Sequence, residues 1–130
     1  ALLHALEGLR PLTAGRLMLV FGCGGDRDQG KRLEMGRVAC EKADWVCATS
    51  DNPRSEDPAS ILEAVREGLS ESAHVVMDRQ EAIELAVQAA APEDVLLIAG
   101  KGHEQYQEVN GVRLPFDDRA VASAAMRRRA

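Results

Sequence analysis

Three segments of this sequence carry residues that could hold a small charged molecule. They are the glycine-rich run at residues 21–28, the tetrapeptide at residues 51–54 and the loop at residues 100–104. Each follows a short apolar run of the kind that forms a buried strand. Loops that leave the carboxyl ends of parallel strands converge on one crevice of an open α/β sheet. Two arginines, a carboxylate, an asparagine amide and glycine backbone would then meet at one site, and this set of groups suits a small zwitterion better than a nucleotide.

The tetrapeptide reads Asp51-Asn52-Pro53-Arg54. Pro53 restricts the preceding Asn52 to extended conformations and fixes its own φ angle, so the side chains of Asn52 and Arg54 point in defined directions. The same residues also allow a turn that begins at Asp51 and leaves Arg54 in solvent. Only the presence of the other two segments favours a binding role over this turn.

The glycine-rich run presents Arg27 on a flexible turn. A guanidinium can grip a carboxylate with two parallel hydrogen bonds, so an arginine at the predicted crevice is suited to clamp a carboxylate. A solvated arginine on a tight surface loop is the alternative. In the third segment the glycines, Gly100 among them, let the backbone approach a ligand closely, and Glu104 can pair with an ammonium group. His103 receives no role.

Residues 25–31 also match part of a nucleotide-binding P-loop, G-x-x-x-x-G-K. A P-loop continues with Ser or Thr, whose hydroxyl binds Mg²⁺, but Arg32 follows here. Asp26 and Asp28 would face the phosphates, and each like-charge contact at about 4 Å costs on the order of 4 kcal/mol at an effective dielectric constant of about 20. The dinucleotide pattern G-x-G-x-x-G fails as well, because Arg27 stands at its third glycine. We therefore expect no nucleotide phosphate in this loop.

The elements that would position these segments alternate between strand and helix. Asp57 and Asp78 are typical helix N-caps, and Asn110-Gly111 predicts a tight β-hairpin around it. The pattern predicts an α/β fold with a doubly wound, mostly parallel sheet and a C-terminal antiparallel hairpin. We expect strands at residues 16–22, 45–49, 74–77, 95–99, 106–109 and 112–114, and helices at residues 1–9, 31–43, 58–69, 79–90 and 117–129.

Composition narrows the class of protein. With 130 residues and a net charge of −5, the chain is one domain by length and offers no general basic surface for nucleic acid or an anionic membrane. No apolar stretch approaches the roughly 20 residues that cross a bilayer, and there is no signal-peptide pattern. We therefore expect a cytoplasmic protein without nucleic-acid or membrane partners. The chain begins at Ala1, without a methionine and inside an expected helix, so we expect a piece of a longer protein.

The cysteines indicate neither a disulfide framework nor a metal site. Cys23, Cys40 and Cys47 are odd in number and lack metal-ligand spacing. We expect reduced thiols, with Cys40 and Cys47 in the core. Cys23 belongs to the glycine-rich run and is expected to be accessible.

Four segments together resemble a known family. They are residues 20–32 (VFGCGGDRDQGKR), 49–58 (TSDNPRSEDP), 98–104 (IAGKGHE) and 116–119 (FDDR). Their order and spacing resemble the C-terminal domain of Mur ligases of the MurE type, over essentially the whole chain. The resemblance implies a Rossmann-like fold for residues 1–130, as the single amino-acid-binding domain of a longer three-domain enzyme. That enzyme would be an ATP-dependent ligase that adds meso-diaminopimelate to UDP-MurNAc-L-Ala-D-Glu in peptidoglycan precursor synthesis.

The resemblance also implies a set of substrate-binding residues and no catalytic or metal-binding residue in this chain. Arg54 is the position at which lysine-adding relatives differ, so the motif at residues 51–54 indicates diaminopimelate as the substrate. The implied contacts to diaminopimelate are Arg27, Asn52, Arg54, Gly100 and Glu104, with Asp51 and Pro53 completing the loop.

In the resemblance, ATP and Mg²⁺ belong to the complete enzyme, and the UDP-MurNAc-dipeptide is held by its other two domains. This chain alone is then expected to bind no cofactor and to be inactive. The alternative is a free-standing Rossmann-like module that binds a small zwitterionic or acidic ligand.

Overall fold

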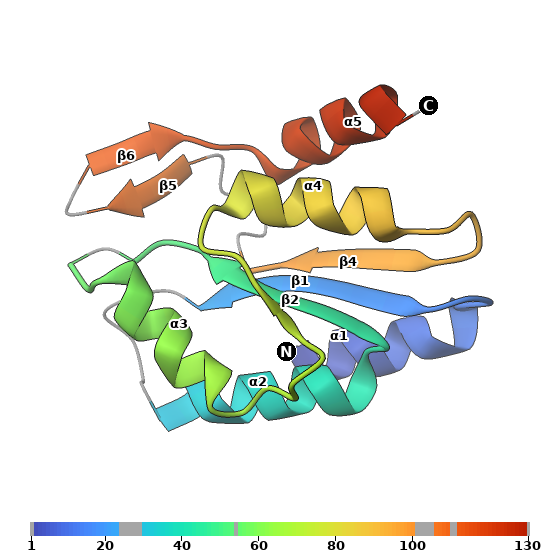
Figure 1. Ribbon diagram of the computed structural model, residues 1–130, viewed down its shortest axis with the longest axis horizontal. Coiled ribbons are helices and arrows are strands. Elements are labelled where there is room, and N and C mark those ends of the chain that lie inside the picture. The colour runs from blue at the N-terminus through green and yellow to red at the C-terminus, as the bar shows by residue number, and fades with distance from the viewer. Residues whose placement is uncertain (1, 24–29, 54, 101–105, 110–111, 130) are drawn as a thin grey trace.

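The computed structural model describes residues 2–23, 30–53, 55–100, 106–109 and 112–129, and it has the predicted alternation of strands and helices (Figure 1). The helices are α1 (Leu2–Leu9), the 3₁₀ helix η1 (Arg10–Leu12), α2 (Gly30–Lys42), α3 (Pro58–Arg66), α4 (Arg79–Ala89) and α5 (Asp118–Arg129). The strands are β1 (Leu17–Cys23), β2 (Trp45–Ser50), β3 (His74–Val75), β4 (Val95–Ala99), β5 (Tyr106–Val109) and β6 (Val112–Pro115).

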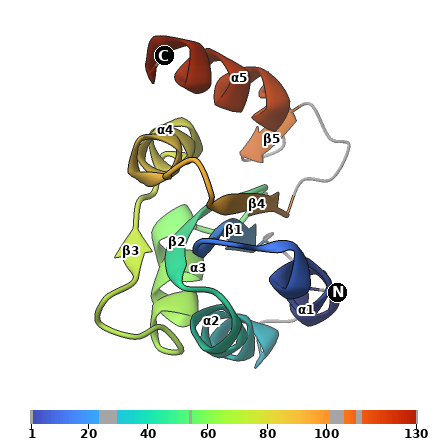
Figure 2. The ribbon, with the colours of Figure 1, turned by 90° about the vertical axis from the view of Figure 1, so that its right-hand side faces the viewer.

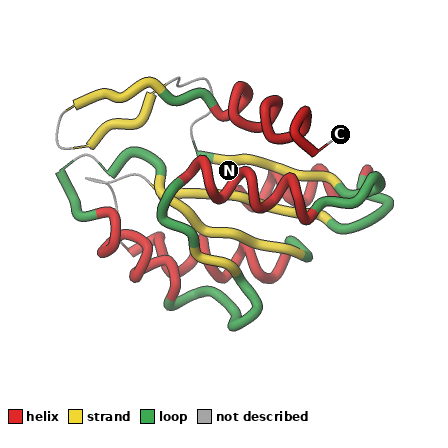
Figure 3. Tube along the Cα trace, turned by 45° about the horizontal axis from the view of Figure 1, so that its top comes forward, coloured by secondary structure: helices red, strands yellow, loops and turns green. Residues whose placement is uncertain are grey.

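Four strands form a parallel sheet in the order β3-β2-β1-β4. β1 lies in the middle and is buried along its whole length, because both faces of the sheet are covered by helices. β3 keeps only two of the four residues predicted for it. β5 and β6 pair antiparallel in a second sheet, which Figure 3 shows apart from the main one. The predicted doubly wound sheet and its C-terminal hairpin are therefore confirmed.

The sheet separates two apolar cores, and β1 supplies both by alternation. Leu19 and Phe21 belong to the core shared with α1, α2 and α3, whereas Val20 belongs to the core shared with α4. Figure 2 shows α1, α2 and α3 on one face of the sheet, and α4 on the other face with α5 outside it. α5 adds Ala125 to the second core, and its Arg129 donates a hydrogen bond of 2.6 Å to the Val87 carbonyl of α4.

Two aspartates begin helices, as predicted. The Asp57 carboxylate accepts from the Ala59 amide at 3.1 Å, with Pro58 in the first helical position of α3. The Asp78 carboxylate accepts from the Gln80 amide at 2.9 Å at the start of α4. Both side chains satisfy backbone N–H groups that have no partner within the helix.

Two of the three thiols differ from expectation. Cys23 extends β1 by one residue and is 7% exposed, so the expectation of an accessible thiol is wrong. Burial raises its pKa to about 11. Cys40 is half-buried, and its sulfur accepts from the Ser70 amide at 3.3 Å. Cys47 is buried as predicted, and burial raises its pKa to about 11.

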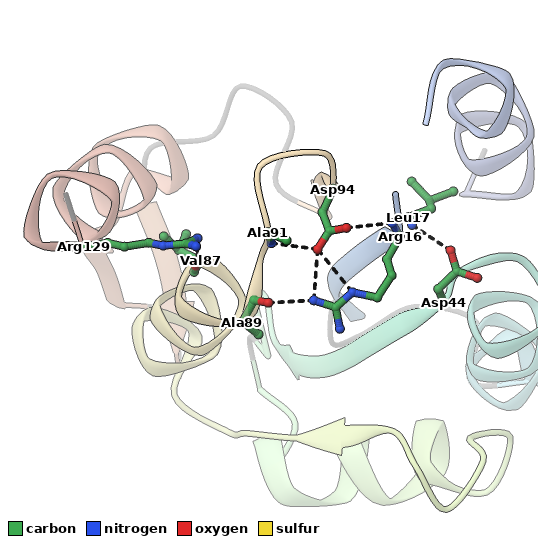
Figure 4. Close-up of polar contacts among 8 residues, drawn as sticks. All are labelled: Arg16, Leu17, Asp44, Val87, Ala89, Ala91, Asp94 and Arg129. Atoms are coloured by element: carbon green, nitrogen blue, oxygen red, sulfur yellow. Dashed lines mark hydrogen bonds and ion pairs between the residues drawn. The ribbon is translucent and has the colours of Figure 1, made fainter. Parts of the chain in front are cut away.

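Carboxylates close the loops at the amino ends of the strands (Figure 4). Asp94 accepts from the backbone amides of Ala91 and Arg16, at 2.8 and 2.7 Å, and from the Arg16 guanidinium at 3.0 Å. These contacts, the backbone amides first, lower the pKa of Asp94 to about 2. On the other side of β1, Asp44 accepts from the Leu17 amide at 2.8 Å.

No helix in the described residues is long and apolar enough to cross a membrane.

We expect the stabilising effect of Asp94 to depend on pH. Its pKa in the folded chain, about 2, lies below the ordinary value of 3.8, so the ionised carboxylate stabilises the fold fully above the unfolded value, and this contribution is lost as the pH falls towards the folded value. Asp94→Asn should lower the midpoint of chemical denaturation near neutral pH and lower it progressively less as the solution is acidified. The exposed neighbour provides the control Glu93→Gln. A deficit of Asp94→Asn that is the same at every pH would contradict the assignment.

Candidate functional site

The three segments singled out in the sequence leave one edge of the sheet. β1, β2 and β4 are parallel neighbours, with Cys23 paired to Ser50 and Phe21 paired to Ala99. The structure therefore places Asp51, Asn52, Pro53 and Gly100 directly beyond the carboxyl ends of these strands. Arg27, Arg54 and Glu104, the other predicted site residues, lie outside the described residues.

The roots of the three segments are packed so closely that two of them require glycine. A Cβ atom at Gly22 would lie 2.8 Å from the Ser50 carbonyl carbon and 2.9 Å from the Asp51 nitrogen. Gly100 has a φ of +121°, which side-chain-bearing residues rarely adopt, and a Cβ there would lie 3.2 Å from the Gly22 oxygen and 3.4 Å from Asp51 Oδ2. The Asp51 carboxylate thus lies beside the backbone of Gly100.

The first three residues of the tetrapeptide are buried. Asn52 is 1% exposed, and Asp51 and Pro53 are also enclosed. Arg54, whose exposure distinguishes a binding role from a simple turn, lies outside the described residues.

A buried arginine joins the ends of the two strands from which the loops at Asp51 and Gly100 leave. Arg79, at the start of α4, is 1% exposed and donates to the Ser50 carbonyl at 3.0 Å and to the Ala99 carbonyl at 3.2 Å. These are the last residues of β2 and β4, directly before Asp51 and Gly100. Its Nε and Nη2 atoms donate to the Asp118 carboxylate of α5 at 2.8 and 2.7 Å. The guanidinium therefore reaches across the carboxyl end of β1 and links the ends of β2 and β4 to α5.

A second arginine holds the far side of the tetrapeptide. Arg32, in the first turn of α2, forms two parallel hydrogen bonds with the Glu56 carboxylate at 2.8 and 3.0 Å. The hydrogen bonds to Glu56 raise the pKa of Arg32 above its ordinary value. Arg32, which stands where a P-loop has its hydroxyl, is thus paired with a carboxylate of this chain.

Comparisons with known proteins show the family of this chain. The sequence model of the family described as "Mur ligase, glutamate ligase domain" matches residues 1–102. The chain belongs to this Mur ligase family. The resemblance seen in the sequence is therefore confirmed, and the Asp117-Asp118 segment of this Mur ligase domain has a physical role. Asp118 neutralises Arg79, and Asp117 accepts from the Arg119 amide at 3.0 Å at the start of α5.

Individual relatives are similar over nearly the whole chain. The UDP-N-acetylmuramoyl-L-alanyl-D-glutamate–2,6-diaminopimelate ligase of Chlorobaculum tepidum is 52% identical over 127 residues, which are 95% of this chain and 25% of the relative. The ligase of the same name from Prochlorococcus marinus is 51% identical over 128 residues, 97% of this chain and 25% of the relative. A solved structure of a ligase of this name superposes with a TM-score of 0.92 at 45% identity, over 98% of this chain and 27% of that one. The chain spans about a quarter of the length of these relatives.

Sequence reasoning missed the residues that hold this edge of the Mur ligase domain together. The sequence predicts a helix start at Arg79 through its neighbour Asp78, but it does not indicate the contact of Arg79 with the later FDDR segment. Gln107 of β5 received no role, yet its amide nitrogen lies 2.7 Å from both the Ser50 hydroxyl and the Asp51 carbonyl. No local pattern around Gln107 signals this contact.

We expect the Arg79–Asp118 pair to be a large contributor to the stability of the domain. Arg79→Ala leaves a partly buried carboxylate and two strand-end carbonyls without this donor, and removing one partner of a buried ion pair costs about 3–5 kcal/mol of unfolding free energy. Chemical denaturation of the wild type and the variant measures the loss. Arg128→Ala is the matched control, because its pair with Glu84 is exposed and should contribute no more than about 1 kcal/mol. Equal losses for the two variants would contradict this role.

Proposed function

We propose that this Mur ligase domain binds meso-diaminopimelate for an ATP-dependent ligase that joins it to UDP-MurNAc-L-Ala-D-Glu in peptidoglycan precursor synthesis. The observation that carries the proposal is the shared edge at which Asp51, Asn52, Pro53 and Gly100 lie together. The chain is also 52% and 51% identical to two proteins named as diaminopimelate ligases. Residues 1–130 are then the amino-acid-binding domain of a three-domain enzyme.

The chemistry of the ligand explains the kinds of residue at this edge. Meso-diaminopimelate has an amino-acid head at each end. One amine must lose its proton to attack an activated carboxylate, while the other head must be held and distinguished from the end of lysine, which has an ammonium but no carboxylate. The head that lies away from the reacting amine, here called the distant head, therefore needs an anion to bind its ammonium and a guanidinium to bind its carboxylate.

In the proposal, Glu104 holds the ammonium of the distant head and Arg54 holds its carboxylate together with Asn52. Arg27 holds a further carboxylate of the ligand. Asp51 and Pro53 shape the loop, and Gly100 contacts the ligand through its backbone. The pairs Arg79–Asp118 and Arg32–Glu56 support this arrangement, because Arg79 holds Ser50, directly before the tetrapeptide, and Arg32 holds Glu56, two residues after it.

ATP and Mg²⁺ are assigned to the rest of the complete enzyme. Arg32, which stands where a P-loop has its Mg²⁺-binding hydroxyl, is instead paired with Glu56, and this pairing supports the assignment. Activation of the D-glutamate carboxylate is therefore assigned to the other domains, which also hold the uridine nucleotide. This chain binds and orients the incoming amino acid in the cytoplasm, where the nucleotide substrates are.

The 130-residue chain by itself should not hydrolyse ATP, because its P-loop-like segment is acidic and lacks the hydroxyl that binds Mg²⁺. Phosphate release would be measured with and without meso-diaminopimelate and the UDP-MurNAc-dipeptide, with the complete ligase as the positive control. Diaminopimelate-dependent phosphate release by the chain alone would show that the assignment of ATP hydrolysis to the other domains is wrong. If the coding frame before Ala1 encodes no P-loop, the free-standing binding module is favoured instead.

In the complete ligase, Arg54→Ala should lose most of kcat/KM for meso-diaminopimelate, while the rate with lysine falls much less or rises. A site built around such a polar partner rejects an analogue that lacks it by roughly 10⁴-fold or more, and lysine would leave the guanidinium unpaired. Arg54→Lys should restore little, because an ammonium cannot reproduce the bidentate grip.

Steady-state kinetics with each amino acid tests this assignment, and Arg37→Ala, an exposed arginine of α2, is the matched control. Equal losses with the two amino acids would mean that Arg54 serves the fold or the head that both ligands share. The specificity assignment would then be abandoned.

A further inference from the structure

One side chain of the hairpin holds the root of the Asp51 loop. The Gln107 amide nitrogen of β5 lies 2.7 Å from the Ser50 hydroxyl and 2.7 Å from the Asp51 carbonyl. A carbonyl can only accept, so the contacting atom is the amide nitrogen, and its two N–H groups serve two consecutive residues. In Figure 1, β5 lies over the segment that leaves β2.

These two hydrogen bonds form in a protected place. Ser50 and Asp51 are buried, and Gln107 is half-buried. The Ser50 carbonyl accepts from Arg79 at 3.0 Å. The backbone at the end of β2 is thus held by α4 through Arg79 and by β5 through Gln107.

Gln107 also closes a connection between the two loops of the proposed site. Gly100, where the second loop begins, packs beside the Asp51 carboxylate, and Gln107, seven residues later in the sequence, binds the Asp51 carbonyl. Asp51 is therefore contacted from both ends of the segment at residues 100–107. Gln107 thus adds a second link between the two loops, beside the one that Arg79 makes with the Ser50 and Ala99 carbonyls.

We propose that Gln107 is a positioning residue of the amino-acid site, which fixes the backbone of Ser50 and Asp51 relative to Gly100. The proposal rests on the function proposed above and adds a residue to it. Gln107 does not need to touch the ligand. It sets the spacing of the loops that do, so its loss should weaken binding of meso-diaminopimelate and leave binding of ATP unchanged.

The test uses the complete ligase with Gln107→Met, which keeps the length of the side chain and removes the donor. Because net hydrogen bonds contribute modestly, KM for meso-diaminopimelate should rise about tenfold, which corresponds to about 1.4 kcal/mol, with kcat and KM for ATP unchanged. Gln107→Glu should raise this KM further, since a carboxylate oxygen would face the Asp51 carbonyl. Ser50→Ala removes one of the two contacts and should have a smaller effect, and it should add little when combined with Gln107→Met.

Gln88→Met, an exposed glutamine of α4, is the matched control and should behave as the wild type. Thermal unfolding of each variant is recorded beside the kinetics. A wild-type KM for meso-diaminopimelate in Gln107→Met would overturn the proposal. So would an equal rise in KM for all substrates with a lower unfolding temperature, which is the result of a purely structural role. A wild-type enzyme that does not use meso-diaminopimelate would instead overturn the proposed function, and the positioning role with it.

Discussion

The buried guanidinium of Arg79 is the interaction on which this edge of the domain depends. A charge enclosed by protein is tolerated only when it is paired and hydrogen-bonded, and Arg79 meets this condition with four hydrogen bonds to three parts of the fold. Two strand ends and the first turn of α5 must therefore all be in place around one side chain. The positions of Asp51 and Gly100 follow from this requirement, because each directly follows a carbonyl that Arg79 holds.

The contacts at the two ends of the sheet have different consequences. At the amino ends, Asp44 and Asp94 accept N–H groups of Leu17 and Arg16, which lie 27 and 78 positions away in the sequence, and so hold the starts of the strands together. At the carboxyl ends, Arg32, Arg79 and Gln107 hold the chain beside the loops of the proposed site. The amino ends thus serve stability, whereas the carboxyl ends also set the distances between loops that carry polar residues suited to ligand contact.

Local patterns predicted most of the fold. The continuous apolar run of β1 required cover on both faces, and the caps Asp57 and Asp78 located two helix starts, because these signals lie within a few residues of each other. The contacts of Arg79 and Gln107 escaped prediction because they join residues 39 and 56 positions apart, and no local spacing encodes such a pair. Cys23 was misjudged for a related reason: glycine content suggested a loop, yet the parallel pairing with Ser50 extends the strand by one residue and buries the thiol.

The Arg79–Asp118 pair also constrains the order in which the domain can be completed on the ribosome. Arg79 is synthesised 39 residues before its counter-ion, so the sheet and α4 can emerge while the guanidinium still needs water as its partner. The charge of Arg79, which holds the ends of β2 and β4, is balanced only after the first turn of α5 has been synthesised. Late synthesis of this one aspartate thus postpones the final closure of the edge until nearly all of the chain described here has been translated.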